Sequence, residues 1–126
     1  MSLRSDLGRV RGLGSAKEGV AHWWAQRLTA IALIPLMLWL VASLAWLTGA
    51  DIVAVESWIA DPIVAVLLVL LLATGFYHAQ LGLQVVIEDY VHSEALKLFS
   101  IILVKFLAIA LAVSAIFAVL RIAFTG

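Results

Sequence analysis

His78 is the side chain of this sequence with the clearest capacity for chemistry. It lies inside the stretch from Pro62 to Ile87, which carries no Asp, Glu, Lys or Arg and is long enough to cross a bilayer as a helix. An imidazole in hydrocarbon costs free energy unless something pairs with it, so an ionisable or metal-binding side chain at that depth indicates a functional site. We therefore take His78 as a candidate metal ligand.

An acid and a tyrosine, Asp89 and Tyr90, follow where this apolar stretch ends. Eleven helical steps of 100° place Asp89 about 20° past three full turns from His78, so the two share one helix face. Such a pair can serve quinone chemistry, with the tyrosine hydroxyl donating to a quinone carbonyl and the acid delivering protons, because two-electron reduction of a quinone consumes two protons. The alternative is a polar helix end with Tyr90 as an interfacial aromatic residue.

Two glycines flank the histidine on its own helix face, Gly75 three residues before it and Gly82 four residues after it. Glycines above and below a ligand leave room for a flat macrocycle such as haem to approach the backbone. The alternative is a seam of small residues that packs against another helix, with His78 making an interhelical hydrogen bond. Neither interpretation excludes the other.

A haem bound by His78 receives one axial ligand from this chain, because His22 and His92 are expected near the membrane surface. A six-coordinate haem then needs a second imidazole from another polypeptide. Arg27, at the start of the first apolar segment, is either a snorkelling charge that sets topology or the partner of a haem propionate. The same two interpretations hold for His22, whereas His92 is expected in a solvated loop.

The composition places all of these residues in a membrane protein. The chain has 126 residues, of which 65% are hydrophobic and 13% charged, and its mean hydropathy is +1.15. Such values are typical of integral membrane proteins. The sequence has no cysteine, which excludes disulfides, iron–sulfur ligation and covalent attachment of haem through Cys-x-x-Cys-His.

Three apolar segments predict an all-α membrane domain over residues 1–126. The expected helices cover about residues 23–48, 61–89 and 93–123, each longer than the roughly 20 residues that cross a 30 Å hydrocarbon core. Residues 1–21 have no sustained apolar period and are expected to form an N-terminal cytoplasmic arm. The connections are short, so neighbouring helices should be antiparallel.

Basic residues indicate the orientation of these helices. The connection formed by residues 49–60 contains Asp51 and Glu56 but no Lys or Arg, whereas five basic residues precede or open the first segment, namely Arg4, Arg9, Arg11, Lys17 and Arg27. The positive-inside rule therefore places the N-terminus in the cytoplasm and, after three spans, the C-terminus in the periplasm. The absence of an Arg- and Ser-rich presequence favours a bacterial cytoplasmic membrane over a mitochondrial inner membrane.

Two segments resemble a known family. Residues 77–92 read YHAQLGLQVVIEDYVH and contain a histidine followed by glycine four residues later and by Asp-Tyr eleven and twelve residues later. This pattern resembles the second-helix signature of the hydrophobic membrane-anchor subunit of succinate dehydrogenase, respiratory complex II. Residues 19–30, GVAHWWAQRLTA, are similar to that family's approach to its first helix.

The resemblance implies a heterotetramer of the respiratory chain and the tricarboxylic acid cycle. In it a flavoprotein oxidises succinate, an iron–sulfur subunit passes the electrons on, and two anchor subunits hold one haem b between them beside a ubiquinone site. Carried over by position, His78 is the axial haem ligand of this chain, Tyr90 a quinone contact, Asp89 part of the proton network and Arg27 a propionate partner. The implied partners are those three subunits and the lipid bilayer, with no nucleic acid.

Two other functions are consistent with the same residues. The related anchor of a quinol:fumarate reductase would use the same parts in the reverse direction. A cofactor-free membrane scaffold would use the three helices only to recruit partners, and it predicts that replacing His78 changes neither spectra nor turnover.

Overall fold

The computed structural model of the chain describes residues 3, 5–7 and 17–125, and all regular secondary structure in this part is helical. Within residues 17–125 four helices follow one another: α2 (Lys17–Trp46), α3 (Ile52–Ala60), α4 (Pro62–Tyr90) and α5 (Glu94–Thr125). Three of them, α2 from Gly19 onward, α4 and α5, are long and apolar enough to cross a membrane. The expected all-α architecture with three such helices is therefore confirmed.

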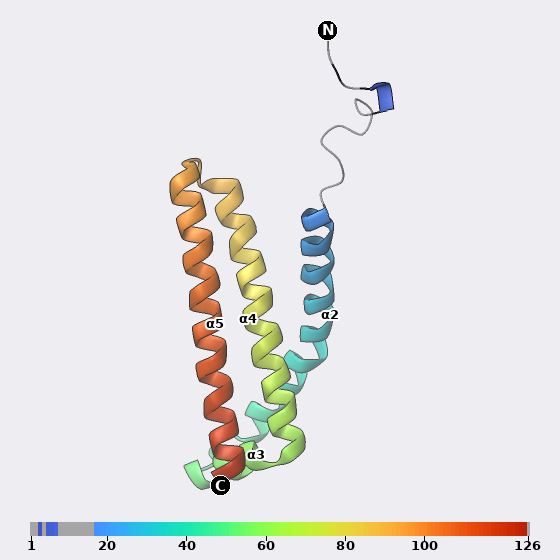
Figure 1. Ribbon diagram of the computed structural model, residues 1–126. Helices are drawn as coiled ribbons and strands as arrows, with labels where there is room; N and C mark the ends of the chain where they lie inside the picture. Colours follow the sequence, from blue (N-terminus) through green and yellow to red (C-terminus); the bar gives the residue numbers. More distant parts are fainter. Residues whose placement is uncertain (1–2, 4, 8–16, 126) are drawn as a thin grey trace.

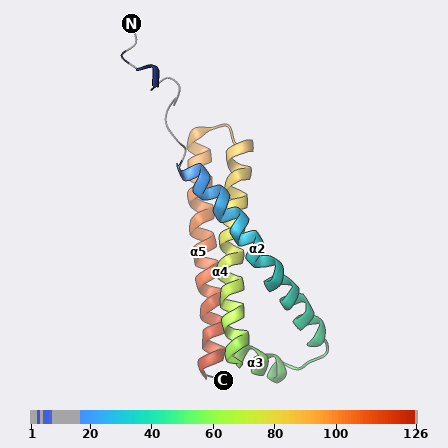
Figure 2. The same cartoon turned by 90° about the vertical axis from the view of Figure 1, so that its right-hand side faces the viewer.

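Helix α4 is the central element of the chain. Both α2 and α5 pack against it, whereas the backbones of α2 and α5 do not approach each other closely in the described residues. Figure 1 shows α4 running from the end of the molecule that holds the C-terminus to the opposite end, and α5 returning beside it. Figure 2 shows α2 crossing the other two helices obliquely, so that its last turns diverge from α4. Consecutive spans are antiparallel, as predicted.

Local sequence explains where α4 begins and ends. The carboxylate of Asp61 accepts hydrogen bonds from the backbone N–H groups of Ile63 and Val64 at 2.9 and 3.2 Å, and Pro62 occupies the first helical turn. An acidic N-cap followed by proline is a strong helix start, because the first N–H groups have no partner inside the helix. At the other end Val91 closes α4 by donating its N–H to Ile87 O at 2.9 Å.

The connection between the first and second spans contains a helix that the sequence analysis did not predict. Helix α3 is capped by Asp51, whose carboxylate accepts from Ala54 N at 2.9 Å. Trp58 in α3 stacks on Trp39 of α2, with ring centroids 5.8 Å apart. This aromatic contact, together with the packing of α3 against α4 and α5, holds the connection across one end of the molecule.

The first span begins earlier than predicted. Helix α2 starts at Lys17, so residues 17–21 of the expected N-terminal arm are helical. The rest of that arm lies outside the described residues apart from Leu3 and residues 5–7. The fold itself does not assign a membrane side to either end, so the cytoplasmic N-terminus and periplasmic C-terminus stay predictions.

Little of the chain is buried within its own fold. In the described part, the buried side chains are those of Ala65, Leu68, Gln80 and Leu81. Large apolar side chains are exposed along all three long helices, among them Ile31 at 63% and Phe106 at 68%. An apolar exterior of this extent requires lipid or other protein subunits around it.

Candidate functional site

His78 lies in α4 on the side that faces α2 and is half-buried there. Its ring nitrogen Nδ1 is 2.9 Å from the hydroxyl oxygen of Thr29 in α2. This contact joins the two helices at the level of the histidine. It also matches the interhelical hydrogen bond that was the alternative prediction for the imidazole.

The hydroxyl of Thr29 determines which histidine nitrogen carries the proton. Its oxygen lies 2.6 Å from Ala25 O and 3.1 Å from Gln26 O, both carbonyls of the preceding turn. The single hydroxyl proton is therefore donated to the helix backbone, and the oxygen is left as an acceptor. For a neutral imidazole this network assigns the proton to His78 Nδ1, which leaves the lone pair on Nε2.

That protonation state is the one that a metal-binding histidine uses. A ligating imidazole commonly donates its second ring N–H to an oxygen, and this fixes both the tautomer and the ring orientation. Among the described residues, the hydrogen bond to Thr29 is the one that the His78 ring makes, and Nε2 has no hydrogen-bond partner. The residues present therefore fit an axial haem ligand.

The two glycines around His78 lie at the contact between α2 and α4. A methyl group added at Gly75 would lie 3.9 Å from Leu33 Cδ2, and one added at Gly82 would lie 3.7 Å from Gln26 Nε2. These are ordinary van der Waals distances, so both glycines support close helix packing within the chain. Clearance for a haem at the same positions stays a prediction.

Two other predicted residues, His22 and Arg27, line a cavity of about 440 Å³ together with Gln26 and Gly82. Both His22 Nε2 and Gln26 Oε1 are buried atoms without a hydrogen-bond partner. A buried polar atom costs free energy when it is left unpaired, so these two atoms are destabilising in the isolated chain. The guanidinium carbon of Arg27 lies 5.2 Å from the ring centroid of Trp23, and the side chain is otherwise exposed.

Asp89 and Tyr90 form the end of α4 and are separate from the histidine cluster. The helical rise of 1.5 Å per residue puts them about 16 to 18 Å from His78 along the axis. Both side chains are exposed, Tyr90 at 77%. Within the described residues neither makes a side-chain hydrogen bond or ion pair, so both are available to a ligand at the rim of the bundle.

Sequence reasoning missed two residues that the fold brings to this site, Thr29 and Gln26. Thr29 stands seven residues after His22 and Gln26 four residues after it, which places both near the same helix face. That spacing was visible in the sequence. The sequence did not show how α2 is rotated, and this rotation is what turns the face toward His78.

No group of three or more His, Asp and Glu side chains suited to one metal ion occurs in the described part of the chain. A single histidine is sufficient for haem, because the porphyrin nitrogens supply the other in-plane ligands and a second axial ligand can come from another subunit.

Comparison with known proteins gives one consistent result. A family model described as the succinate dehydrogenase/fumarate reductase transmembrane subunit matches residues 1–117. The chain is similar to a succinate dehydrogenase hydrophobic membrane anchor subunit from Rickettsia bellii, at 38% identity over 92% of this chain and 93% of the relative.

Relatives from other organisms carry a similar description. A succinate dehydrogenase membrane anchor subunit from Reclinomonas americana is 34% identical over 74% of this chain and 80% of its own length. The hydrophobic membrane anchor subunit from Paracoccus denitrificans is 32% identical over 74% of both chains. No solved structure gives a significant match.

Proposed function

The chain belongs to the succinate dehydrogenase/fumarate reductase transmembrane subunit family as a membrane-anchor subunit, and from this premise we propose that it shares one haem b with a second anchor subunit and contributes to a ubiquinone-reduction site. The observation that carries the proposal is the pairing of His78 Nδ1 with Thr29. It leaves Nε2 with the lone pair that an axial ligand requires.

Within this proposal His78 ligates the haem iron, and Arg27 and His22 are the groups that pair with haem propionates. His22 and Arg27 line one cavity, and one ring nitrogen of His22 has no hydrogen-bond partner; both observations support that assignment. The haem supplies a one-electron carrier inside the membrane. Thr29 holds the imidazole in orientation and keeps the proton on Nδ1.

The second axial ligand must come from another polypeptide. His22 precedes Thr29 by seven residues, which is about 10 Å of helix, and His92 lies beyond the end of α4. Neither is at the level of His78. A second hydrophobic subunit that contributes its own histidine satisfies this requirement, and an iron–sulfur subunit and a flavoprotein complete the proposed assembly.

Tyr90 and Asp89 are the residues of this chain that we assign to the quinone. Reduction of a ubiquinone adds two electrons, delivered from the iron–sulfur subunit, and two protons. The Tyr90 hydroxyl donates a hydrogen bond to a quinone carbonyl, and Asp89 beside it passes protons from water. The exposed position of both side chains at the end of α4 supports this role.

The anchor of a quinol:fumarate reductase remains the second candidate, because the family description covers both enzymes. The curated relatives are named for succinate dehydrogenase, which favours the succinate-oxidising direction. Bacterial relatives support a bacterial cytoplasmic membrane as the location.

A labelling experiment tests the proposed orientation. The chain has no cysteine of its own, so cysteines introduced at Ser93 and at Thr48 report on opposite ends of the bundle. We expect a membrane-impermeant maleimide to label Ser93→Cys from the cytoplasmic side and Thr48→Cys from the periplasmic side, because the basic residues of α2 lie at the same end as Ser93. The reverse pattern would overturn the orientation.

Removing the hydroxyl of Thr29 tests the histidine geometry. Thr29→Val leaves the Nδ1–H of His78 without an acceptor, which makes the imidazole a weaker donor to ferric iron. We expect the haem to remain bound and its midpoint potential to rise by up to about 60 mV, the equivalent of a tenfold change for one electron. The measurement is a redox titration of the purified complex.

Thr29→Ser is the matched control, since it keeps the hydroxyl and should keep the original potential. If the valine and serine variants have the same potential, Thr29 does not hold the imidazole in the assembled complex.

A further inference from the structure

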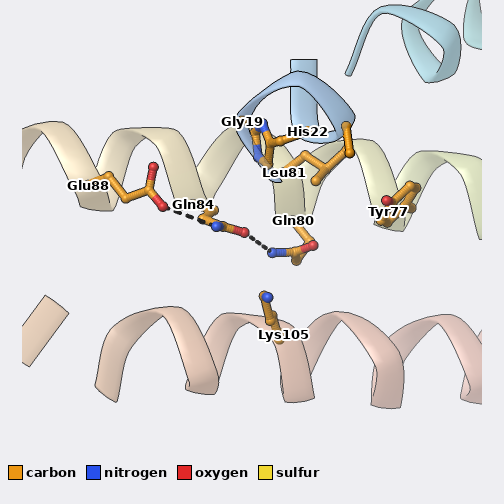
Figure 3. A pocket seen from close by; sticks show the side chains of 9 residues that line it. Gly19, His22, Tyr77, Gln80, Leu81, Gln84, Glu88 and Lys105 are labelled. Atoms are coloured by element: carbon orange, nitrogen blue, oxygen red, sulfur yellow. Dashed lines mark hydrogen bonds between the residues drawn. The ribbon is translucent and has the colours of Figure 1, made fainter. Parts of the chain in front are cut away.

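A row of polar side chains runs along α4 on the face that is turned away from His78. Gln80 donates from Nε2 to Gln84 Oε1 at 3.0 Å, and Gln84 donates from Nε2 to Glu88 Oε1 at 3.1 Å (Figure 3). Gln80 is only 7% exposed. The two amides point the same way, each with its N–H end toward the carboxylate, so their dipoles favour negative charge at Glu88 and positive charge beyond Gln80.

A cation lies at that far end of the row. Lys105 is in the interior of α5 and lines one cavity with Gln80, Gln84 and Glu88, and Figure 3 shows it reaching from α5 toward Gln80. It has no ion-pair partner among the described residues, where the one ion pair joins Glu94 to Lys97. A lone ammonium group inside an apolar span is costly unless it is paired or hydrated.

The polar cavity that Lys105 lines is continued by an apolar cavity along the helices. The polar cavity has a volume of about 580 Å³ and extends from Glu88 to Gln80 and Lys105. A second cavity of about 360 Å³ shares Gln80 and Lys105 and continues between α4 and α5 along apolar side chains that include Phe76, Ala112 and Ile116. Together they form an amphipathic groove, called here the α4–α5 groove, whose polar part is also bordered by Gly19, Ala21 and His22 of α2.

The order of groups along the α4–α5 groove is acid, cation, then apolar wall. From the end of α4 inward, Glu88 comes first, Lys105 is level with Gln80 about 12 Å further along the helix, and the apolar part follows. A phospholipid that carries a primary ammonium in its headgroup has the complementary order from the water inward: ammonium, phosphate, acyl chain. Each charge of the lipid then meets the opposite charge of the protein.

From this complementarity we propose that the α4–α5 groove binds one zwitterionic aminophospholipid of the leaflet at the α4–α5 turn. Its ammonium pairs with Glu88, its phosphate with Lys105 and with amide N–H groups of Gln80 and Gln84, and one acyl chain lies along the apolar part. The lipid-binding residues point away from His78 and Tyr90, because two helical steps of 100° put Gln80 opposite His78 and Glu88 opposite Tyr90, whereas His22 borders both this site and the cavity of Arg27.

The test uses the whole complex, purified in mild detergent and supplied with equal amounts of phosphatidylethanolamine, phosphatidylcholine and phosphatidylglycerol. Native mass spectrometry should detect one retained phosphatidylethanolamine. We expect Lys105→Met to lower its occupancy at least tenfold, and Ala112→Phe, which blocks the acyl part without touching a charge, to do the same. Lys97→Met, which removes a lysine outside the groove, should have no effect.

Reversing the charge of Glu88 should change which lipid the groove binds, as well as abolish binding of the original lipid. Glu88→Lys should release phosphatidylethanolamine and retain the anionic phosphatidylglycerol instead. Retained lipid that mirrors the supplied mixture, or that is unchanged in both Lys105→Met and Ala112→Phe, would overturn the proposal. Crosslinking gives a further test. If a cysteine introduced at Ala108, in the same groove, crosslinks to another subunit, a protein fills the groove and the proposal is overturned.

Discussion

Replacing His78 with alanine is expected to lower the haem content of the purified complex by about tenfold or more. Changes in residues that merely support a metal ligand already cost about 10- to 100-fold in affinity, and this change removes the ligand itself. The low-spin b-type absorption spectrum should be lost with the haem. His78→Tyr should instead perturb the spectrum, because a phenolate is a different axial donor. Both variants can be followed by optical spectra normalised to the flavin content of the complex.

His92→Ala provides the matched control for this prediction. It removes another imidazole from the same region of the chain, but one that is exposed beyond the end of α4, and its spectrum should be unchanged. A cofactor-free scaffold predicts the same spectrum in all of these variants. An unaltered b-type spectrum in His78→Ala would therefore end the haem proposal and leave the membrane-anchor assignment standing.

Tyr90→Phe is expected to slow ubiquinone reduction by about 100-fold, the lower end of the range for loss of a positioned proton donor. Phenylalanine keeps the aromatic ring and removes only the hydroxyl. Oxidation of succinate by an artificial soluble acceptor should stay intact, because those electrons leave before they reach the quinone. The measurement is the ratio of the two activities in the same preparation.

Tyr77→Phe is the control, since Tyr77 is the other tyrosine of the chain and its hydroxyl makes no hydrogen bond among the described residues. Its ratio of activities should match the unaltered protein. A Tyr90→Phe enzyme that reduces quinone as fast as it reduces the soluble acceptor would remove Tyr90 from the quinone site.

The three spans were predictable because their signal is local. Each apolar run exceeds the length that a bilayer requires, and Asp61 with Pro62 marks the start of α4 within one residue of the predicted helix. Helix α3 was missed because its sequence is too short and too apolar to show a clear helical period, and its cap at Asp51 is a single residue. The early start of α2 was missed because Gly19 and the charges around it resemble a loop.

The site was predictable in its residue types and less so in its geometry. The position of His78 in an uncharged stretch identified it, and the flanking glycines indicated a close approach. The protonation of its ring depends on Thr29, which lies on another helix, and no pattern within one helix gives the rotation of its neighbour. The polar row of Gln80, Gln84 and Glu88 was missed for the same reason. Its four-residue spacing is visible in the sequence, but its proximity to Lys105 depends on how α4 packs against α5.

The central position of α4 has a consequence for the life of the subunit in the cell. Because α2 and α5 flank α4 without a close backbone approach to each other, a newly inserted copy has no closed bundle of its own, and a buried histidine nitrogen and a buried amide oxygen on α2 have no hydrogen-bond partner. Unpaired polar groups in a membrane span are costly, so the lone subunit is less stable than the assembled one. Surplus copies should therefore be short-lived, and their abundance should follow the synthesis of the subunit that pairs with them.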